Sequence, residues 1–147
     1  MKKLSASSIG TFDKCPKKYH YQYIEKPDIP KQDWSHLELG KCAHRTLELF
    51  HEDLIKNVRE TSDYPKVMKD SFKKAVSEFD MAILKDSLQD LKDIIQNYLI
   101  KIQLNGLPNV IYNELEFSFN INDYVVRGFI DRIDKISDTE FKVVDYK

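Results

Sequence analysis

Two acidic side chains stand among apolar residues near the C-terminal end of the chain, Asp131 and Asp145. In an extended segment alternate residues share a face, so Asp131 lies on the same face as Phe129 and Ile133. A carboxylate between apolar neighbours is costly unless a divalent cation or a lysine compensates its charge. Lys147 lies two residues beyond Asp145, on the same face. Two carboxylates and a lysine on neighbouring strands are suited to metal-assisted attack on a phosphodiester.

Two predicted strands must hold these groups side by side. They span residues 124–134 and 140–147, and a turn at 137–139 joins them. Before them, residues 111–121 alternate apolar and polar side chains, which predicts a third strand with one wet face. A turn at 120–123 links this strand to the next one. We therefore expect an antiparallel β-meander that carries the active site.

Helices are predicted ahead of the strands, so the expected fold class is α+β. Ser5 is suited to the N-cap of a first short helix, and Pro16 to the first turn of a second. Apolar residues that recur at helical spacing predict three longer helices, and Gly106 and Pro108 end the last of them. The predicted helices span residues 6–13, 17–25, 37–58, 64–85 and 88–104.

The size and composition of the chain indicate one soluble domain, residues 1–147. A formal net charge of -1 argues against coating nucleic acid by bulk attraction, although a local basic groove remains compatible with it. No apolar run is long enough to span a membrane, and no secretory signal opens the chain. Two cysteines make no disulfide framework, so we expect a cytoplasmic location. Because the chain stops within a predicted strand, we expect either a longer protein or a second chain to supply the rest.

Three sequence blocks resemble one known family. The first spans residues 4–21 and has a serine-rich start followed by a Cys-Pro-Lys-Lys-Tyr segment. The second, residues 40–48, is similar to a Gly-x-x-x-His-x-x-Leu-Glu helix. The third pairs residues 128–134 with 144–147, the latter reading Val-Asp-Tyr-Lys. In this order they resemble the RecB-like branch of the PD-(D/E)xK nuclease superfamily, which includes AddB-type nucleases and CRISPR-associated exonucleases.

This resemblance implies a restriction-endonuclease-like α/β core and assigns roles to four residues. His44, Asp131 and Asp145 would be ligands of Mg²⁺ or Mn²⁺, and the imidazole favours Mn²⁺. Asp131, Asp145 and Lys147 would form the catalytic set, with the lysine positioning water and stabilising negative charge. Family members continue beyond the Asp-x-Lys strand, so the resemblance also implies that the C-terminal part of the domain is missing here.

Cys15 has two interpretations. In some members of the branch a cysteine at this place joins three near the C-terminus to bind a [4Fe-4S] cluster. The chain has one further cysteine, Cys42, which lies in another block. Cys15 is therefore either the first cluster ligand of a longer protein or a buried apolar cysteine.

Several polar neighbours of these blocks have more than one interpretation. Glu48 either orients His44 or forms a salt bridge with a lysine. Asp134 is predicted to pair with a nearby arginine or lysine rather than with a metal. Glu114 and Glu116, on the polar face of the first strand, either approach the site or lie on a solvated face, and the solvated face is the preferred prediction. The mixture of lysines and tyrosines near the N-terminus suits single-stranded DNA as well as it suits a core. The lysines and tyrosines of this mixture are Lys14, Lys17, Lys18, Tyr19, Tyr21 and Tyr23.

The function that the resemblance implies is metal-dependent DNA hydrolysis in repair or recombination, as an exonuclease or an endonuclease. The expected partners are single-stranded DNA or duplex ends and a helicase, with no membrane. The alternative is a catalytically incomplete nuclease-like module that binds DNA ends or a helicase partner. A more remote alternative is an RNA-processing nuclease with the same metal site.

Overall fold

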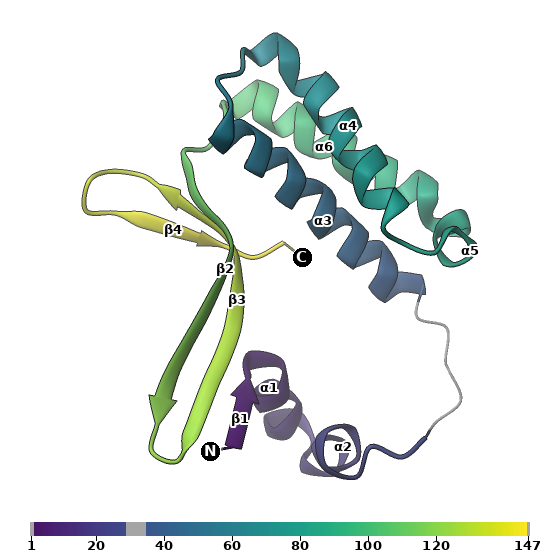
Figure 1. The fold of residues 1–147 in the computed structure, drawn as a ribbon, viewed down its shortest axis with the longest axis vertical. Helices are drawn as coiled ribbons and strands as arrows, with labels where there is room; N and C mark the ends of the chain where they lie inside the picture. The colour runs from purple at the N-terminus through teal and green to yellow at the C-terminus, as the bar shows by residue number, and fades with distance from the viewer. Residues whose placement is uncertain (1, 29–34, 147) are drawn as a thin grey trace. The chain divides into compact units, whose positions relative to one another are not determined.

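The computed structural model describes residues 2–28 and 35–146 of the chain (Figure 1). Lys147 lies outside these residues, so its predicted role stays a prediction. The chain forms two compact units, one of residues 1–32 and 115–130 and the other of residues 33–114 and 131–147. No helix among the described residues is both long and apolar enough to cross a membrane.

Three long helices build the second unit: α3 (Ser35–Lys56), α4 (Tyr64–Ser77) and α6 (Leu88–Asn105). Helix α3 packs against both of the others, and α4 packs against α6. Short helical turns, η2 (Thr61–Asp63), α5 (Met81–Leu84) and η3 (Lys85–Ser87), fill the connections. The largest fully buried apolar side chains of the core are Phe50, Met68, Leu84 and Leu91.

The long helix predicted over residues 64–85 is divided in the structure. Helix α4 ends at Ser77, and Asp80 begins α5 by accepting a hydrogen bond from the amide of Ala82 at 2.8 Å. A short acidic side chain prefers to cap a helix rather than to continue one. This local choice outweighs the apolar periodicity that extends across the break.

The N-terminal part of the first unit contains β1 (Lys2–Ser5), α1 (Ala6–Lys14), α2 (Pro16–Tyr19) and the π-helical segment η1 (His20–Glu25). The predicted N-cap is confirmed, because the Ser5 side chain accepts a hydrogen bond from the amide of Ser8. Pro16 occupies the first turn of α2, also as predicted. Helix α2 runs directly into η1, which ends at Lys26 with a left-handed φ of 48°.

Within the part of the chain that the structure describes, the sheet has four strands with β3 (Tyr124–Lys135) at its centre, and together with the helices it makes the fold α+β, as predicted. Strand β2 (Val110–Ile121) neighbours β3, and β4 (Phe141–Val144) pairs with it antiparallel, Arg132 opposite Val144. The sheet also contains a strand that the sequence did not predict, because β1 pairs with β3 in parallel. Residues 2–5 read Lys-Lys-Leu-Ser, in which apolar and polar residues do not alternate, so the sequence pattern does not indicate this strand.

Strand β4 is shorter than the predicted segment of residues 140–147. It ends at Val144, and the amide of Tyr146 donates instead to the carboxylate of Asp131 at 2.7 Å. Of the apolar residues on the same strand faces as Asp131 and Asp145, Ile133 is half-buried, as expected. The other three are exposed, against expectation: Phe129, Phe141 and Val143, at 64%, 53% and 64% of their full accessibility.

Candidate metal centre

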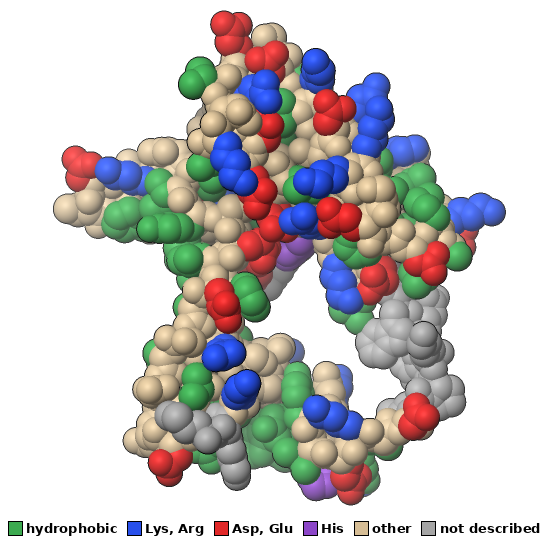
Figure 2. Space-filling model, viewed as in Figure 1, with side chains coloured by type: hydrophobic (Ala, Val, Ile, Leu, Met, Phe, Trp, Pro, Cys, Tyr) green, Lys and Arg blue, Asp and Glu red, His purple; other side chains and the backbone are tan. Residues whose placement is uncertain are grey.

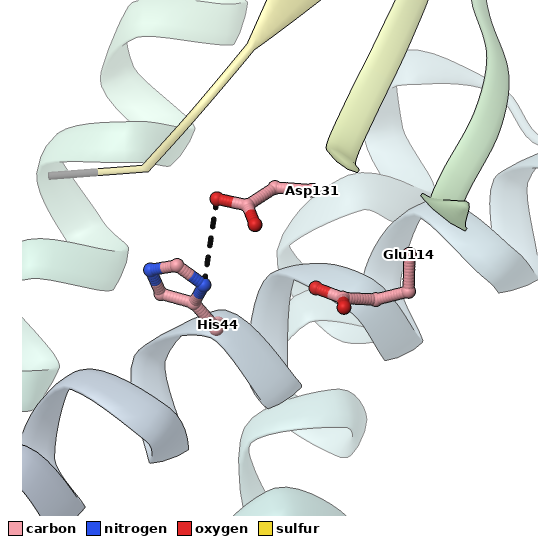
Figure 3. Close-up of side chains that lie close together, drawn as sticks. All are labelled: His44, Glu114 and Asp131. Atoms are coloured by element: carbon pink, nitrogen blue, oxygen red, sulfur yellow. Dashed lines mark ion pairs between the residues drawn. The ribbon is translucent and has the colours of Figure 1, made fainter. Parts of the chain in front are cut away.

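His44 and Asp131 face each other in the second unit (Figure 3). Helix α3 carries His44 and strand β3 carries Asp131, and the Nδ1 and Oδ2 atoms lie 3.5 Å apart. The Asp131 side chain is 14% exposed and the His44 side chain 34%. Glu114 of β2 completes the group, since one ligand atom from each of the three residues lies within 4.8 Å of the others. An imidazole and two carboxylates in this arrangement form a candidate site for a divalent cation.

The backbone of Glu114 explains why this side chain reaches the site. Its φ of 50° lies in the left-handed region, which a residue other than glycine rarely adopts within a strand. As a result Asn113, Glu114 and Leu115 are all half-buried, and the alternation of faces is interrupted. The interpretation of Glu114 as part of a solvated face was therefore wrong, whereas Glu116 is exposed as expected. Nothing in the sequence pattern signals this change of backbone conformation.

Electrostatics at Glu114 favour a positive charge in the site. Burial raises the pKa of its carboxyl group, and the negative charges of Asp131 and Glu48 raise it further. His44 and Arg45 act in the opposite direction with smaller effect. A bound cation would relieve this repulsion between half-buried carboxylates.

Tyr146 fixes the orientation of both His44 and Asp131 through its backbone. Its amide donates to Asp131, and its carbonyl oxygen lies 2.9 Å from Nε2 of His44. A carbonyl oxygen can only accept, so Nε2 carries a hydrogen. Nδ1 is then the ring nitrogen that faces Asp131, and a cation bound to both atoms would fit this arrangement.

Asp145 lies directly after β4 and is exposed. Within the described part of the chain, the group of close ligand atoms does not include it. Its assignment as a ligand, like that of Lys147 as a catalytic residue, stays a prediction.

A groove of about 730 Å³ opens beside the three residues within the second unit. On one wall Arg45 is held by two glutamates, with Nε 2.7 Å from Glu78 and Nη1 2.8 Å from Glu48. These hydrogen bonds raise the pKa of the guanidinium. Glu48 thus forms an ion pair, with an arginine rather than the expected lysine. The groove is lined by Leu37, Gly40, Lys41, His44, Arg45, Glu48, Glu78, Phe79, Glu114 and Asp131.

Asp134 pairs with Arg132, as the sequence predicted. Atoms Nη2 of Arg132 and Oδ2 of Asp134 form a hydrogen bond of 3.0 Å, and both residues are buried. Nε of Arg132 and Oδ1 of Asp134 also lie 2.9 Å apart and form an ion pair, although neither atom has a hydrogen-bond partner among the described residues.

Cys15 is exposed, so its interpretation as a buried apolar cysteine was wrong. Its Sγ accepts a weak hydrogen bond from the amide of Lys18 at 3.4 Å, which caps α2. Its role as a cluster ligand stays a prediction. Cys42 is buried in the core, and burial raises the pKa of its thiol to about 11.

The aromatic residues near the N-terminus contact one another. The rings of Tyr19 and Tyr23 lie 5.1 Å apart and both residues are half-buried, while Phe12 and Tyr21 are exposed. This first unit therefore contains both a small aromatic cluster and exposed rings, and binding of single-stranded DNA there stays a prediction.

Comparison with known proteins places these residues in context. The sequence model of the PD-(D/E)XK nuclease superfamily matches residues 3–147 of this chain. A protein of Streptococcus agalactiae serotype Ia, named as one of the subunits of an ATP-dependent helicase/deoxyribonuclease, is 32% identical over 158 aligned residues. Its namesake from Streptococcus pyogenes serotype M1 is 29% identical over 161. Both alignments cover 99% of this chain but only 14% of the relative. No solved structure gave a significant match.

Proposed function

The chain belongs to the PD-(D/E)XK nuclease superfamily, and we propose that it hydrolyses phosphodiester bonds of DNA with the help of a divalent cation. The observation that carries this proposal is the convergence of His44, Glu114 and Asp131 beside an open groove. Half-buried carboxylates that lie this close together repel each other, and a bound cation would offset that repulsion.

The donor set fits Mg²⁺ or Mn²⁺. Two carboxylates are hard oxygen ligands, and one imidazole nitrogen suits Mn²⁺ in particular. His44, Glu114 and Asp131 would hold the cation, with Asp145 as a further ligand. When bound, such a cation lowers the pKa of a water molecule and offsets negative charge on the phosphate.

The residues of the chain contribute orientation and charge to this reaction. The amide of Tyr146 holds one oxygen of Asp131 in place, and its carbonyl oxygen fixes the ring of His44. Lys147, two residues beyond Asp145, would stabilise the negative charge that develops on the phosphate. The groove admits the DNA backbone to the side of α3 that carries His44.

The biological setting follows from the relatives. Because the chain spans about 14% of the length of the curated relatives, we propose that it acts as the nuclease part of a larger helicase and nuclease assembly in DNA repair, in the cytoplasm. Its substrates would be single-stranded DNA or duplex ends. Cys15 would bind a [4Fe-4S] cluster only together with cysteines from outside these 147 residues, which contain two.

A cleavage assay tests the proposal. Labelled single-stranded and duplex DNA are incubated with the chain in Mn²⁺, Mg²⁺ or EDTA. We expect cleavage in Mn²⁺ or Mg²⁺ and no cleavage in EDTA. The cleavage rate should fall about 100-fold or more in Asp131→Asn and in Glu114→Gln, because each substitution removes a charged ligand. Asp123→Asn, which changes an exposed carboxylate in the turn between β2 and β3, is the matched control and should cleave normally. Full Mn²⁺-dependent cleavage by both site variants would refute the mechanism.

One observation favours a second candidate, a nuclease-like module that binds DNA without cutting it. Asp145, which the family resemblance makes a ligand, is exposed, and the group of close ligand atoms among the described residues does not include it. Fluorescence anisotropy with labelled DNA in EDTA separates the two. Tight binding in EDTA, with no cleavage in Mn²⁺, would support the binding module and exclude catalysis by this chain.

A further inference from the structure

Tyr146 connects the metal centre to a buried polar network on the other face of β3. Asp131 and Arg132 are consecutive strand residues, so their side chains point to opposite faces. The backbone of Tyr146 contacts Asp131 and His44, while its hydroxyl group accepts from Nη1 of Arg132 at 3.1 Å. Its ring packs against the helical core and lies under the Arg132 guanidinium, 5.5 Å from carbon to ring centre. One residue therefore touches both sides of the strand.

Arg132 is itself held firmly. It is 7% exposed, and its charge is balanced by Asp134, which is 3% exposed. Nη1 also donates to the hydroxyl group of Tyr98 on α6. The Tyr98 hydroxyl lies 2.6 Å from Nε2 of His51, a residue of α3 that is 1% exposed.

The direction of these hydrogen bonds is determined by the charges. Burial and the neighbouring Arg132 lower the pKa of His51 to about 3, so its imidazole is neutral at physiological pH. Arg132 can only donate, and Tyr98 therefore accepts from it and donates its own hydrogen to His51. Burial raises the pKa of Tyr98, which keeps the phenol protonated for this purpose.

We propose that Arg132, Tyr98 and His51 form a buried clamp that fixes Tyr146, so that its amide and carbonyl group hold Asp131 and His44 in the orientation that binds metal. None of the three clamp residues lies in the group of close ligand atoms. They are positioning residues, and they act through the peptide groups of residue 146. This inference rests on the proposed metal centre and adds the residues that set its affinity.

The test compares three single-hydroxyl deletions by isothermal titration with Mn²⁺. Tyr98→Phe removes the hydroxyl group of the clamp, and Tyr146→Phe removes the hydroxyl group that Arg132 of the clamp contacts; both variants keep the ring. We expect the Mn²⁺ dissociation constant to rise about tenfold in each, because partners that orient metal ligands contribute about 10- to 100-fold in affinity. Tyr64→Phe, at a buried tyrosine of α4 in the apolar core, is the matched control and should bind Mn²⁺ as the wild type does.

A second measurement needs no metal. Hydrogen exchange of the amide of residue 146, read by NMR in EDTA, should be faster in Tyr146→Phe and Tyr98→Phe than in the wild type and in Tyr64→Phe. If all three variants lose stability equally and keep wild-type Mn²⁺ affinity, the hydroxyl groups serve the fold alone and the inference is overturned. A wild type that binds Mn²⁺ no better than Asp131→Asn would instead overturn the metal centre itself, together with the clamp that depends on it.

Discussion

His51 and His44 lie two turns apart on α3, and they differ in their exposure and in the charge of their neighbours. His44 is partly exposed at the groove and faces two carboxylates. His51 is buried, faces Arg132 and Tyr98, and has its pKa lowered to about 3. The first can bind a cation, while the second is a neutral hydrogen-bond partner inside the fold.

The lowered pKa of His51 predicts a loss of stability in acid. Its ordinary pKa is 6.5, so below that pH the unfolded chain binds a proton that the folded chain does not. Stability contributed by His51 is therefore present above pH 6.5 and is lost as the pH falls toward 3. We expect about 2 kcal/mol less free energy of unfolding at pH 5 than at pH 6.5 from this residue. Urea unfolding at both values measures it.

Two variants isolate the contribution of His51. His51→Gln keeps a hydrogen-bonding side chain but cannot titrate, and its free energy of unfolding should change less between pH 6.5 and pH 5. His20→Gln, at an exposed histidine of η1, should keep the wild-type pH dependence. Parallel pH profiles for the wild type and His51→Gln would show that this imidazole is not the group responsible.

Strands β2 and β3 meet closely where Gly128 faces Phe117. A Cβ atom at position 128 would lie 2.5 and 2.7 Å from two atoms of the Phe117 ring, nearer than real Cβ atoms come. The Phe117 ring is also stacked with that of Phe119, at 6.1 Å. Gly128, the first residue of the sequence block 128–134, therefore has a packing role, because the Phe117 ring covers it.

Gly128→Ala should destabilise the protein, because the added methyl group forces the Phe117 ring to move. We expect a loss of about 1 kcal/mol in the free energy of unfolding, the lower end for overpacking, since the ring can swing. The matched control is Gly10→Ala in α1, where a Cβ meets nothing within 4 Å. There a gain of about 0.5–1 kcal/mol is expected from helix propensity.

A double variant completes this test by chemical denaturation. Adding Phe117→Leu to Gly128→Ala should recover most of the loss that is due to the clash. If the double-mutant cycle shows no coupling between positions 117 and 128, the glycine is required for another reason.

The second unit contains every residue of the candidate metal centre. Helix α3 and strands β2 and β3 contribute His44, Glu114 and Asp131 to it, although these positions are far apart in the sequence. The side chain of Asn113 ties β2 to α3 by donating to the carbonyl group of Glu48 at 2.8 Å. Figure 2 shows acidic and basic side chains intermixed over the helices, which agrees with the net charge of -1.

Binding of Mn²⁺ should stabilise this unit, because a ligand that binds only the folded state shifts unfolding by mass action. At a free concentration of about 100 times the dissociation constant, the expected gain is about 2.7 kcal/mol. Thermal unfolding with and without Mn²⁺ measures it, and EDTA should reverse it. If calorimetry resolves two transitions, the one that carries α3, α4 and α6 should move. An equal shift in Asp131→Asn would mean that Mn²⁺ binds elsewhere.

Much of the fold could be predicted from the sequence, because the signals are local. The Ser5 cap, the apolar periodicity of α3 and α6 and the alternation in β2 each depend on residues within a few positions of one another. The blocks that carry His44 and Asp131 were also visible, and the structure brings these two residues within 3.5 Å. Their spacing of 87 positions, 131 less 44, gave no indication of that distance.

Contacts between distant segments decided the rest. Strand β1 is defined by its parallel pairing with β3, and Glu114 reaches the site through a left-handed backbone angle in β2. Tyr146 leaves the strand pattern because its amide binds Asp131 and its ring packs against Arg132. Composition and periodicity specify which face of an element is apolar, but they do not specify which polar groups meet across two elements. That choice depends on the free energy of the packed chain, in which each buried polar group needs a partner.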